Sequence, residues 1–331
     1  MAHLFSYELA DGEELVGLTV DMREYLHGTE YWAGVTDAPS VAPFTSRLAV
    51  PFVAGQLPWS APTSFNVVVL AALALGLVAL IAAWVRLELS AGAVLLGTLA
   101  YALAFPVFYW SSFIYVDGAV VGLLAVLLAA LVFDRPWIAL LVLMVAVLAK
   151  ESGLAGVPVV MVWAWLDGPS DAPLIRQRRT WIAVAAVIVG IATMVLARVV
   201  GPTATEFYNP WLPTPSQISR YFGANLGRPG PLAQVVFTAA IPAALVLLAW
   251  RRRSRGEPDL DPRLFWTAMT GVVMALLLNV QALFTAQWDG RTLWTAYPYA
   301  ATLGAAAWHG LANARSSERA GEQGEQRAQV Q

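Results

Sequence analysis

Four ionisable residues stand at the ends of apolar segments, where they could do chemistry at a membrane surface. Asp21 lies in VDMREY, Asp117 lies in FIYVDGA, and Lys150 and Glu151 are adjacent in VLAKESG. A carboxylate can act as a general base, and a lysine can stabilise a phosphate leaving group. Ionisable groups at membrane depth are costly and usually face a cavity or a partner. We therefore take Asp21, Asp117, Lys150 and Glu151 as candidate catalytic residues.

Each of these residues also has a purely structural interpretation. Asp21 could cap a short interfacial helix, with Glu24 at the capping-box position. Asp117 could be the N-cap of the apolar helix that follows it. Lys150 and Glu151 could form an ion pair in a loop, with the lysine extended towards water.

Five further residues are candidates for binding a substrate: Tyr25, Asp37, Arg47, Arg198 and Arg291. An arginine can hold a phosphate with two parallel hydrogen bonds. Arg47, in PFTSRLAVP, could equally anchor the chain to lipid headgroups. Asp37, in GVTDAPS, could equally form a turn.

Several other chemistries find no support in the sequence. The chain has no cysteine and three histidines, and no His, Asp or Glu group has metal-ligand spacing. It contains no phosphate-binding loop, no dinucleotide fingerprint and no GxSxG elbow. The net charge is −2 and no basic stripe is present, which argues against nucleic-acid binding. No cofactor is indicated by the residues, and the need for a divalent metal stays open.

The composition indicates the elements that must position these residues. Of 331 residues, 58% are hydrophobic and 13% are charged, about half the charged share of a soluble protein. A membrane-crossing helix needs roughly 20 mostly apolar residues. We therefore predict an all-α, polytopic membrane bundle of about nine crossings. They are 65–85, 90–110, 118–133, 136–149, 152–166, 180–200, 234–250, 264–284 and 294–312.

Arginine placement predicts the orientation of the bundle. Segment 251–263 carries five arginines and segment 167–179 carries three, which places both in the cytoplasm together with the C-terminus. Segments 1–64 and 201–233 then lie outside, the second with an amphipathic stretch, SQISRYFGANL. The pair 136–149 and 152–166 could instead be one broken helix, but that would put Arg251–Arg253 outside, so we expect a hairpin.

This topology divides the chain into three parts. Residues 1–64 form an outer segment with an interfacial helix, 65–312 form the transmembrane domain, and 313–331 form a polar tail that we expect to be disordered. Residues 1–20 do not read as a signal sequence. Either the outer segment 1–64 crosses the membrane unaided, or a first helix lies upstream of Met1.

The order of the short motifs resembles one group of membrane enzymes. VDMREY, PFTSRLAVP, FPVFYWSSFIYVDGA and VLAKESG follow one another over residues 20–166. This order resembles polytopic GT-C-type glycosyltransferases of bacteria and archaea, in a poorly characterised branch. The resemblance implies a GT-C-like fold in the plasma membrane and a polyprenyl-phosphate-linked sugar as donor. It also implies an acidic catalytic residue in the first outer loop, which corresponds to Asp21.

The chain departs from this group in two ways. Many members carry a soluble C-terminal domain, which we do not expect from these residues, and Asp21 is not part of a double-acidic pair. The sugar and the acceptor, whether glycan, lipid or protein, are not indicated. Two other classes remain as alternatives: a transporter or flippase of lipids or solutes, and a non-catalytic membrane scaffold subunit.

Overall fold

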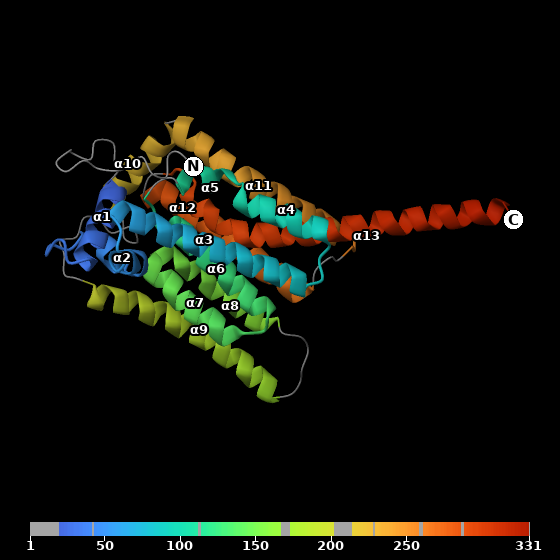
Figure 1. The fold of residues 1–331 in the computed structure, drawn as a ribbon, viewed down its shortest axis with the longest axis horizontal. Helices are drawn as coiled ribbons and strands as arrows, with labels where there is room; N and C mark the ends of the chain where they lie inside the picture. Colours follow the sequence, from blue (N-terminus) through green and yellow to red (C-terminus); the bar gives the residue numbers. More distant parts are fainter. Residues whose placement is uncertain are drawn as a thin grey trace.

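The computed structural model describes residues 20–41, 43–111, 114–166, 173–201, 214–227, 229–257, 261–285 and 288–330. Within these ranges every regular element is a helix, as the composition predicts (Figure 1). Residues 1–19 and 202–213 of the expected outer segments, and 167–172 of an expected inner one, lie outside the described residues.

Each expected apolar segment contains a helix, but 90–110 is divided into two helices, and 152–166 and 294–312 both begin in a 3-10 turn. The helices are α1 (Val20–Trp32), α2 (Ala49–Gly55), α3 (Ala61–Arg86), α4 (Ala91–Ala102), α5 (Phe105–Trp110), α6 (Asp117–Val132), α7 (Pro136–Ala149), α8 (Gly156–Trp165), α9 (Pro173–Val200), α10 (Pro215–Leu226), α11 (Pro229–Ser254), α12 (Pro262–Thr285) and α13 (Tyr297–Val330). Three 3-10 turns also occur: η2 (Phe44–Ser46), η3 (Glu151–Ala155) and η4 (Arg291–Ala296).

Five helical stretches of the described chain are long and apolar enough to cross a membrane. They are Ala61–Arg86, Ala91–Trp110, Gln177–Val200, Pro229–Ser254 and Pro262–Thr285. Helices α6 and α7 are apolar but shorter. These helices indicate a multi-pass membrane protein, and the count of nine crossings stays a prediction.

The bundle has two distinct ends (Figure 1). Helices α1, α2 and α10 gather at one end, and the C-terminal part of α13 projects from the other. The predicted amphipathic stretch is confirmed as a helix, α10. Helix α13 continues to Val330, where the sequence predicts disorder. Alanine, glutamate, glutamine and arginine make up most of that tail, and all four have high helix propensity.

Helix α6 is the centre of the bundle and sets the position of Asp117. Thirteen of its 16 residues are buried, since it is apolar on every face. Gly122 lets α6 approach α3 closely, because a Cβ atom there would lie 2.1 Å from the Ala72 carbonyl oxygen. The first residue of α6 is Asp117, so this tight packing fixes the carboxylate at one end of the core.

The chain reverses after α7, which confirms the expected hairpin. Lys150 has extended backbone angles that end α7, and α8 returns alongside it. A Cβ atom on Gly153 would lie 2.4 Å from the Ala146 carbonyl carbon, and one on Gly156 would lie 2.9 Å from Leu143 Cδ1. In a continuous helix these pairs would be more than about 10 Å apart, at 1.5 Å per residue. The turn places Lys150 and Glu151 beside the start of α6.

Candidate functional site

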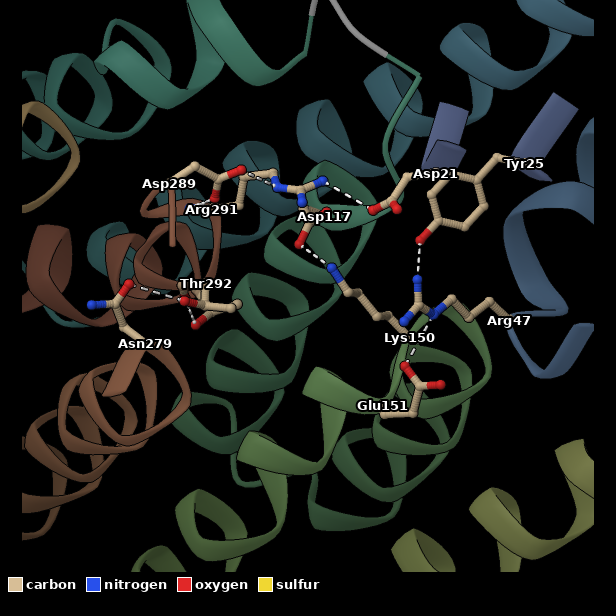
Figure 2. Close-up of polar contacts among 11 residues, drawn as sticks. Asp21, Tyr25, Arg47, Asp117, Lys150, Glu151, Asn279, Asp289, Arg291 and Thr292 are labelled. Atoms are coloured by element: carbon tan, nitrogen blue, oxygen red, sulfur yellow. Dashed lines mark hydrogen bonds and ion pairs between the residues drawn. The ribbon is translucent and has the colours of Figure 1, made fainter. Parts of the chain in front are cut away.

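Side chains from five separate parts of the chain meet at the end of the bundle that holds α1 (Figure 2). They form three neighbouring groups of bonded side chains that we together call the charged cluster: Asp21, Tyr25, Arg47, Asp117, Lys150, Glu151, Asp289 and Arg291. The structure thus brings together seven of the nine candidates from the sequence. Asp289 is the addition.

Lys150 pairs with Asp117 in the middle of the charged cluster. Lys150 Nζ lies 2.7 Å from Asp117 Oδ1, and the two side chains are 14% and 3% exposed. The N-cap of α6 is Val116, and no side chain caps this helix. The interpretation of Asp117 as an N-cap is therefore wrong, since its Oδ1 atom accepts a hydrogen bond from Lys150. The lysine joins two segments that are 33 positions apart.

Arg47 pairs with Glu151 on the other side of the turn. Arg47 Nε donates to Glu151 Oε2 at 3.0 Å, and Arg47 Nη1 donates to the Tyr25 hydroxyl. Burial raises the pKa of Tyr25, and the Arg47 charge offsets part of that rise, so the phenol stays neutral and accepts this bond. Arg47 is 5% exposed, so burial argues against a lipid headgroup anchor. Glu151 bonds with Arg47 and Ser46, whereas its sequence neighbour Lys150 bonds with Asp117.

Arg291 has two carboxylate partners. Its Nε atom lies 2.8 Å from Asp289 Oδ2, and its Nη1 atom lies 3.3 Å from Asp21 Oδ2. The guanidinium carbon lies 4.2 Å from the centre of the Tyr115 ring and 5.8 Å from that of Trp110. Such cation–π contacts attract the guanidinium group to the ring faces. Figure 2 shows Arg291 reaching between the two aspartates.

The turn before η4 holds Asp289 firmly. Its second oxygen, Oδ1, accepts a hydrogen bond from the Arg291 backbone N–H at 3.1 Å. Gly290 has a φ of +84°, and a Cβ atom there would lie 2.9 Å from Val235 Cα. Only glycine fits such a turn without strain. Burial raises the pKa of Asp289 and Arg291 offsets part of the rise, so Asp289 takes up a proton at a higher pH than an ordinary aspartate.

The charges of the cluster can be counted directly. The cluster contains three cations and four carboxylates. Each cation pairs with one carboxylate, in the pairs Arg47–Glu151, Lys150–Asp117 and Arg291–Asp289, so one carboxylate is left over. Asp21 is the fourth acid. Its side chain is 26% exposed, against 10% or less for the other three. The arrangement thus offers one accessible carboxylate beside buried positive charge.

Two candidates from the sequence lie outside the charged cluster. Asp37 is exposed in the loop after α1, and Arg198 is exposed in the last turn of α9. Neither makes a contact with the cluster that the described residues show. Glu24 accepts a hydrogen bond from the Val41 backbone N–H, not the bond of the proposed capping box.

Sequence reasoning missed several residues of the site. Asp289 stands two residues before Arg291 in the sequence, but its role as an acid on Arg291 depends on the fold. Tyr115 and Trp110 gave no signal, since aromatic residues are common at membrane interfaces. A neighbouring pair in Figure 2 was also missed: Thr292 donates a hydrogen bond of 3.2 Å to Asn279, which is buried in α12.

Metal binding is not indicated in the part of the chain that the structure describes. No group of three or more His, Cys, Asp or Glu residues is found there that could hold a metal ion. The chemistry that the cluster can supply is a proton acceptor and cations for an anionic group.

Comparisons with known proteins give no match. No family model, no curated protein and no solved structure matches this chain.

Proposed function

We propose that this protein is a GT-C-type membrane glycosyltransferase, which moves a sugar from a polyprenyl-phosphate carrier to an acceptor. One observation carries the proposal. Asp21, the most exposed acid of the charged cluster, lies next to Arg291 at the same end of an apolar bundle as Lys150. A base and cations for a phosphate are the groups that this transfer needs.

The reaction can be written with these residues in named roles. The acceptor hydroxyl attacks the anomeric carbon of the sugar, and its proton passes to Asp21. The bond between that carbon and the phosphate oxygen breaks, which leaves polyprenyl phosphate. The negative charge that grows on the phosphate is stabilised by Arg291 and Lys150. Asp289 holds Arg291 in place, Asp117 holds Lys150, and the Arg47–Glu151 pair holds the turn.

An apolar cavity supports a lipid-linked donor. It has a volume of about 360 Å³ and lies between α11 and α12, both of which pack on α13. Its lining contains only apolar side chains, among them Pro242, Val246, Trp250 and Leu276. Leu293 and Ala296 of η4 also line it, and η4 begins at Arg291. A hydrocarbon chain in this cavity would have its phosphate end near the cluster.

The topology belongs to the same proposal. Nine crossings in a prokaryotic plasma membrane put the charged cluster at the outer face, and α13 then ends in the cytoplasm. The native chain has no cysteine, so Arg255→Cys gives a single thiol for labelling with a membrane-impermeant reagent. We expect labelling from the cytoplasmic side only. Labelling of intact cells from outside would overturn this orientation.

Sugar transfer itself is tested in membranes. The full chain is expressed in host membranes that receive polyprenyl phosphate carrying a labelled sugar, and the loss of label from the carrier is followed. We expect the label to move to a glycan, lipid or protein fraction faster than in membranes from cells with an empty vector. Equal rates with every sugar offered would contradict the proposal and favour the transporter or scaffold alternative.

A further inference from the structure

The two acids on Arg291 are held in different ways. Asp289 is buried and bonds both the side chain and the backbone of Arg291, within a turn that glycine keeps tight. Asp21 makes a single, longer contact of 3.3 Å and has a side chain that is 26% exposed. It stands in the first turn of α1, a separate helix. Asp21 is therefore the partner that can leave.

The other cations of the charged cluster cannot exchange their partners so easily. Asp117 is 3% exposed, so moving it away from Lys150 would leave a buried charge without compensation. Glu151 is 10% exposed and faces the same penalty if it leaves Arg47. Asp21 is different, because Arg291 keeps Asp289 when Asp21 moves away and water can reach the released carboxylate.

Arg291 is shaped to accept another anion in place of Asp21. Its guanidinium carbon lies 4.2 Å from the centre of the Tyr115 ring, and Asp289 occupies the Nε side of the fork. The Nη1 atom faces Asp21. A guanidinium group binds a carboxylate and a phosphate by similar hydrogen bonds. The phosphodiester of a lipid-linked sugar carries one negative charge, as Asp21 does.

We infer that the donor phosphate exchanges with Asp21 on Arg291, and that this exchange releases Asp21 to serve as the base. The inference rests on the proposed function. It makes the base available when a donor is bound beside it. It also assigns the first phosphate contact to Arg291, with Asp289 as the positioning residue that keeps the guanidinium in place.

Binding of farnesyl phosphate to the detergent-solubilised full chain tests the exchange without any sugar transfer. Asp21→Asn removes the competing charge, and we expect it to tighten binding about two- to fivefold, the range for a partly exposed ion pair. Glu30→Gln is the matched control, because Glu30 lies nine residues further along α1, about 13 Å away. It should leave the affinity unchanged. Arg291→Gln should weaken binding about tenfold or more, as for a lost charged hydrogen bond.

A double variant separates direct exchange from a general change in charge. In an Arg291→Gln background, Asp21→Asn should no longer tighten binding, because the two residues then share no interaction. The same tightening in both backgrounds would mean that Asp21 acts only through its field, and would overturn the inference. So would an affinity that Asp21→Asn leaves unchanged or weakens.

Two further readouts keep the result interpretable. If Arg291→Gln does not fold, judged by its thermal unfolding midpoint, Arg291→Lys replaces it, since lysine keeps the charge but loses the fork. We then expect the effect of Asp21→Asn to shrink without vanishing; an effect as large as in the wild type overturns the inference. The proposed function fails separately, if the wild type binds farnesyl phosphate as described but transfers no sugar.

Discussion

The two ends of the bundle use the same kinds of charged residue in different ways. In the charged cluster, Arg47, Lys150 and Arg291 each have a carboxylate within 3.0 Å. At the opposite end, which we call the arginine-rich end (the described residues 251–257 and 261–263), Arg253 and Arg263 lie over aromatic rings. The Arg263 Nε atom donates to the Trp163 carbonyl oxygen at 2.9 Å.

Aromatic rings and a carbonyl group contact arginines at the arginine-rich end, whereas buried carboxylates contact the cations of the charged cluster. Aromatic rings and carbonyl groups make favourable contacts with an arginine side chain. Unlike a carboxylate, they cannot take up a proton at neutral pH. Among the described residues of the arginine-rich end, Glu257 forms an ion pair with Arg252, and the Glu257 side chain is 47% exposed. The charged cluster instead holds buried acids against cations from distant segments, which is costly unless the pairs are kept together.

The largest effect is expected from breaking a buried pair. Lys150→Met leaves Asp117 buried and uncompensated, so the free energy of unfolding should fall by about 3–5 kcal/mol. Lys150→Arg keeps the charge and should lower the free energy of unfolding by less. The double variant Lys150→Met with Asp117→Leu should recover part of the loss, because no unpaired charge remains. Reversible unfolding in mixed micelles measures all three. Equal stability of Lys150→Met and wild type would contradict the pairing.

Glycine turns at the two ends provide a second comparison. Gly290 and Gly256 both have positive φ angles, but within the described part of the chain only a Cβ atom at Gly290 would meet another segment. Gly256→Ala should lower the free energy of unfolding by about 1–2 kcal/mol. Gly290→Ala should lower it by more, up to about 3 kcal/mol. It should also slow sugar transfer, since Asp289 is displaced from Arg291. Similar losses in both variants would mean that the turn at Gly290 is not specially constrained.

The cavity between α11 and α12 is the proposed binding place for the hydrocarbon chain of the donor. Ala243 lines this cavity, whereas the adjacent Ala244 is not part of the lining. Ala243→Phe should raise the KM for a long-chain donor about tenfold, equivalent to roughly two methylene groups displaced. A donor with a short chain should be unaffected, and Ala244→Phe is the control. If both variants raise the KM equally, or neither does, the hydrocarbon chain of the donor binds outside this cavity.

The smallest effect is expected at the arginine-rich end. Arg253 lies 4.4 Å from the ring centre of Phe265. Arg253→Gln should reduce the free energy of unfolding by only about 0.5–1 kcal/mol, the usual strength of an exposed cation–π contact, and should leave sugar transfer intact. A loss as large as that of Lys150→Met would remove the distinction between the two ends.

Much of the fold could be predicted from the sequence. Long apolar runs identify the helices, because a membrane-crossing segment must satisfy its backbone hydrogen bonds internally. The hairpin at Lys150 was predicted from the placement of arginines in the loops. Seven of the nine candidate residues lie together in the structure. Selecting the ionisable residues near the ends of apolar segments identified most of the side chains that meet at this end of the bundle.

The partners of those residues could not be predicted. Lys150 and Glu151 are adjacent in sequence, yet one bonds with Asp117 and the other with Arg47, over 100 positions away. Such pairing depends on how α6, α7 and η2 pack, which local patterns do not encode. The capping interpretation of Asp117 was wrong for the same reason: a rule for helix ends was applied to a residue that has a tertiary partner.

The most direct test of the account is the turnover of the Asp21→Asn variant at saturating donor. Saturation removes differences in donor binding, so the ratio of kcat values reports the role of the carboxylate in the transition state. We predict a loss of about 10²–10⁴-fold, the usual contribution of a general base, with Glu30→Gln close to wild type. If Asp21→Asn and Asp21→Ala both turn over at the wild-type rate, Asp21 is not the base and the central claim fails.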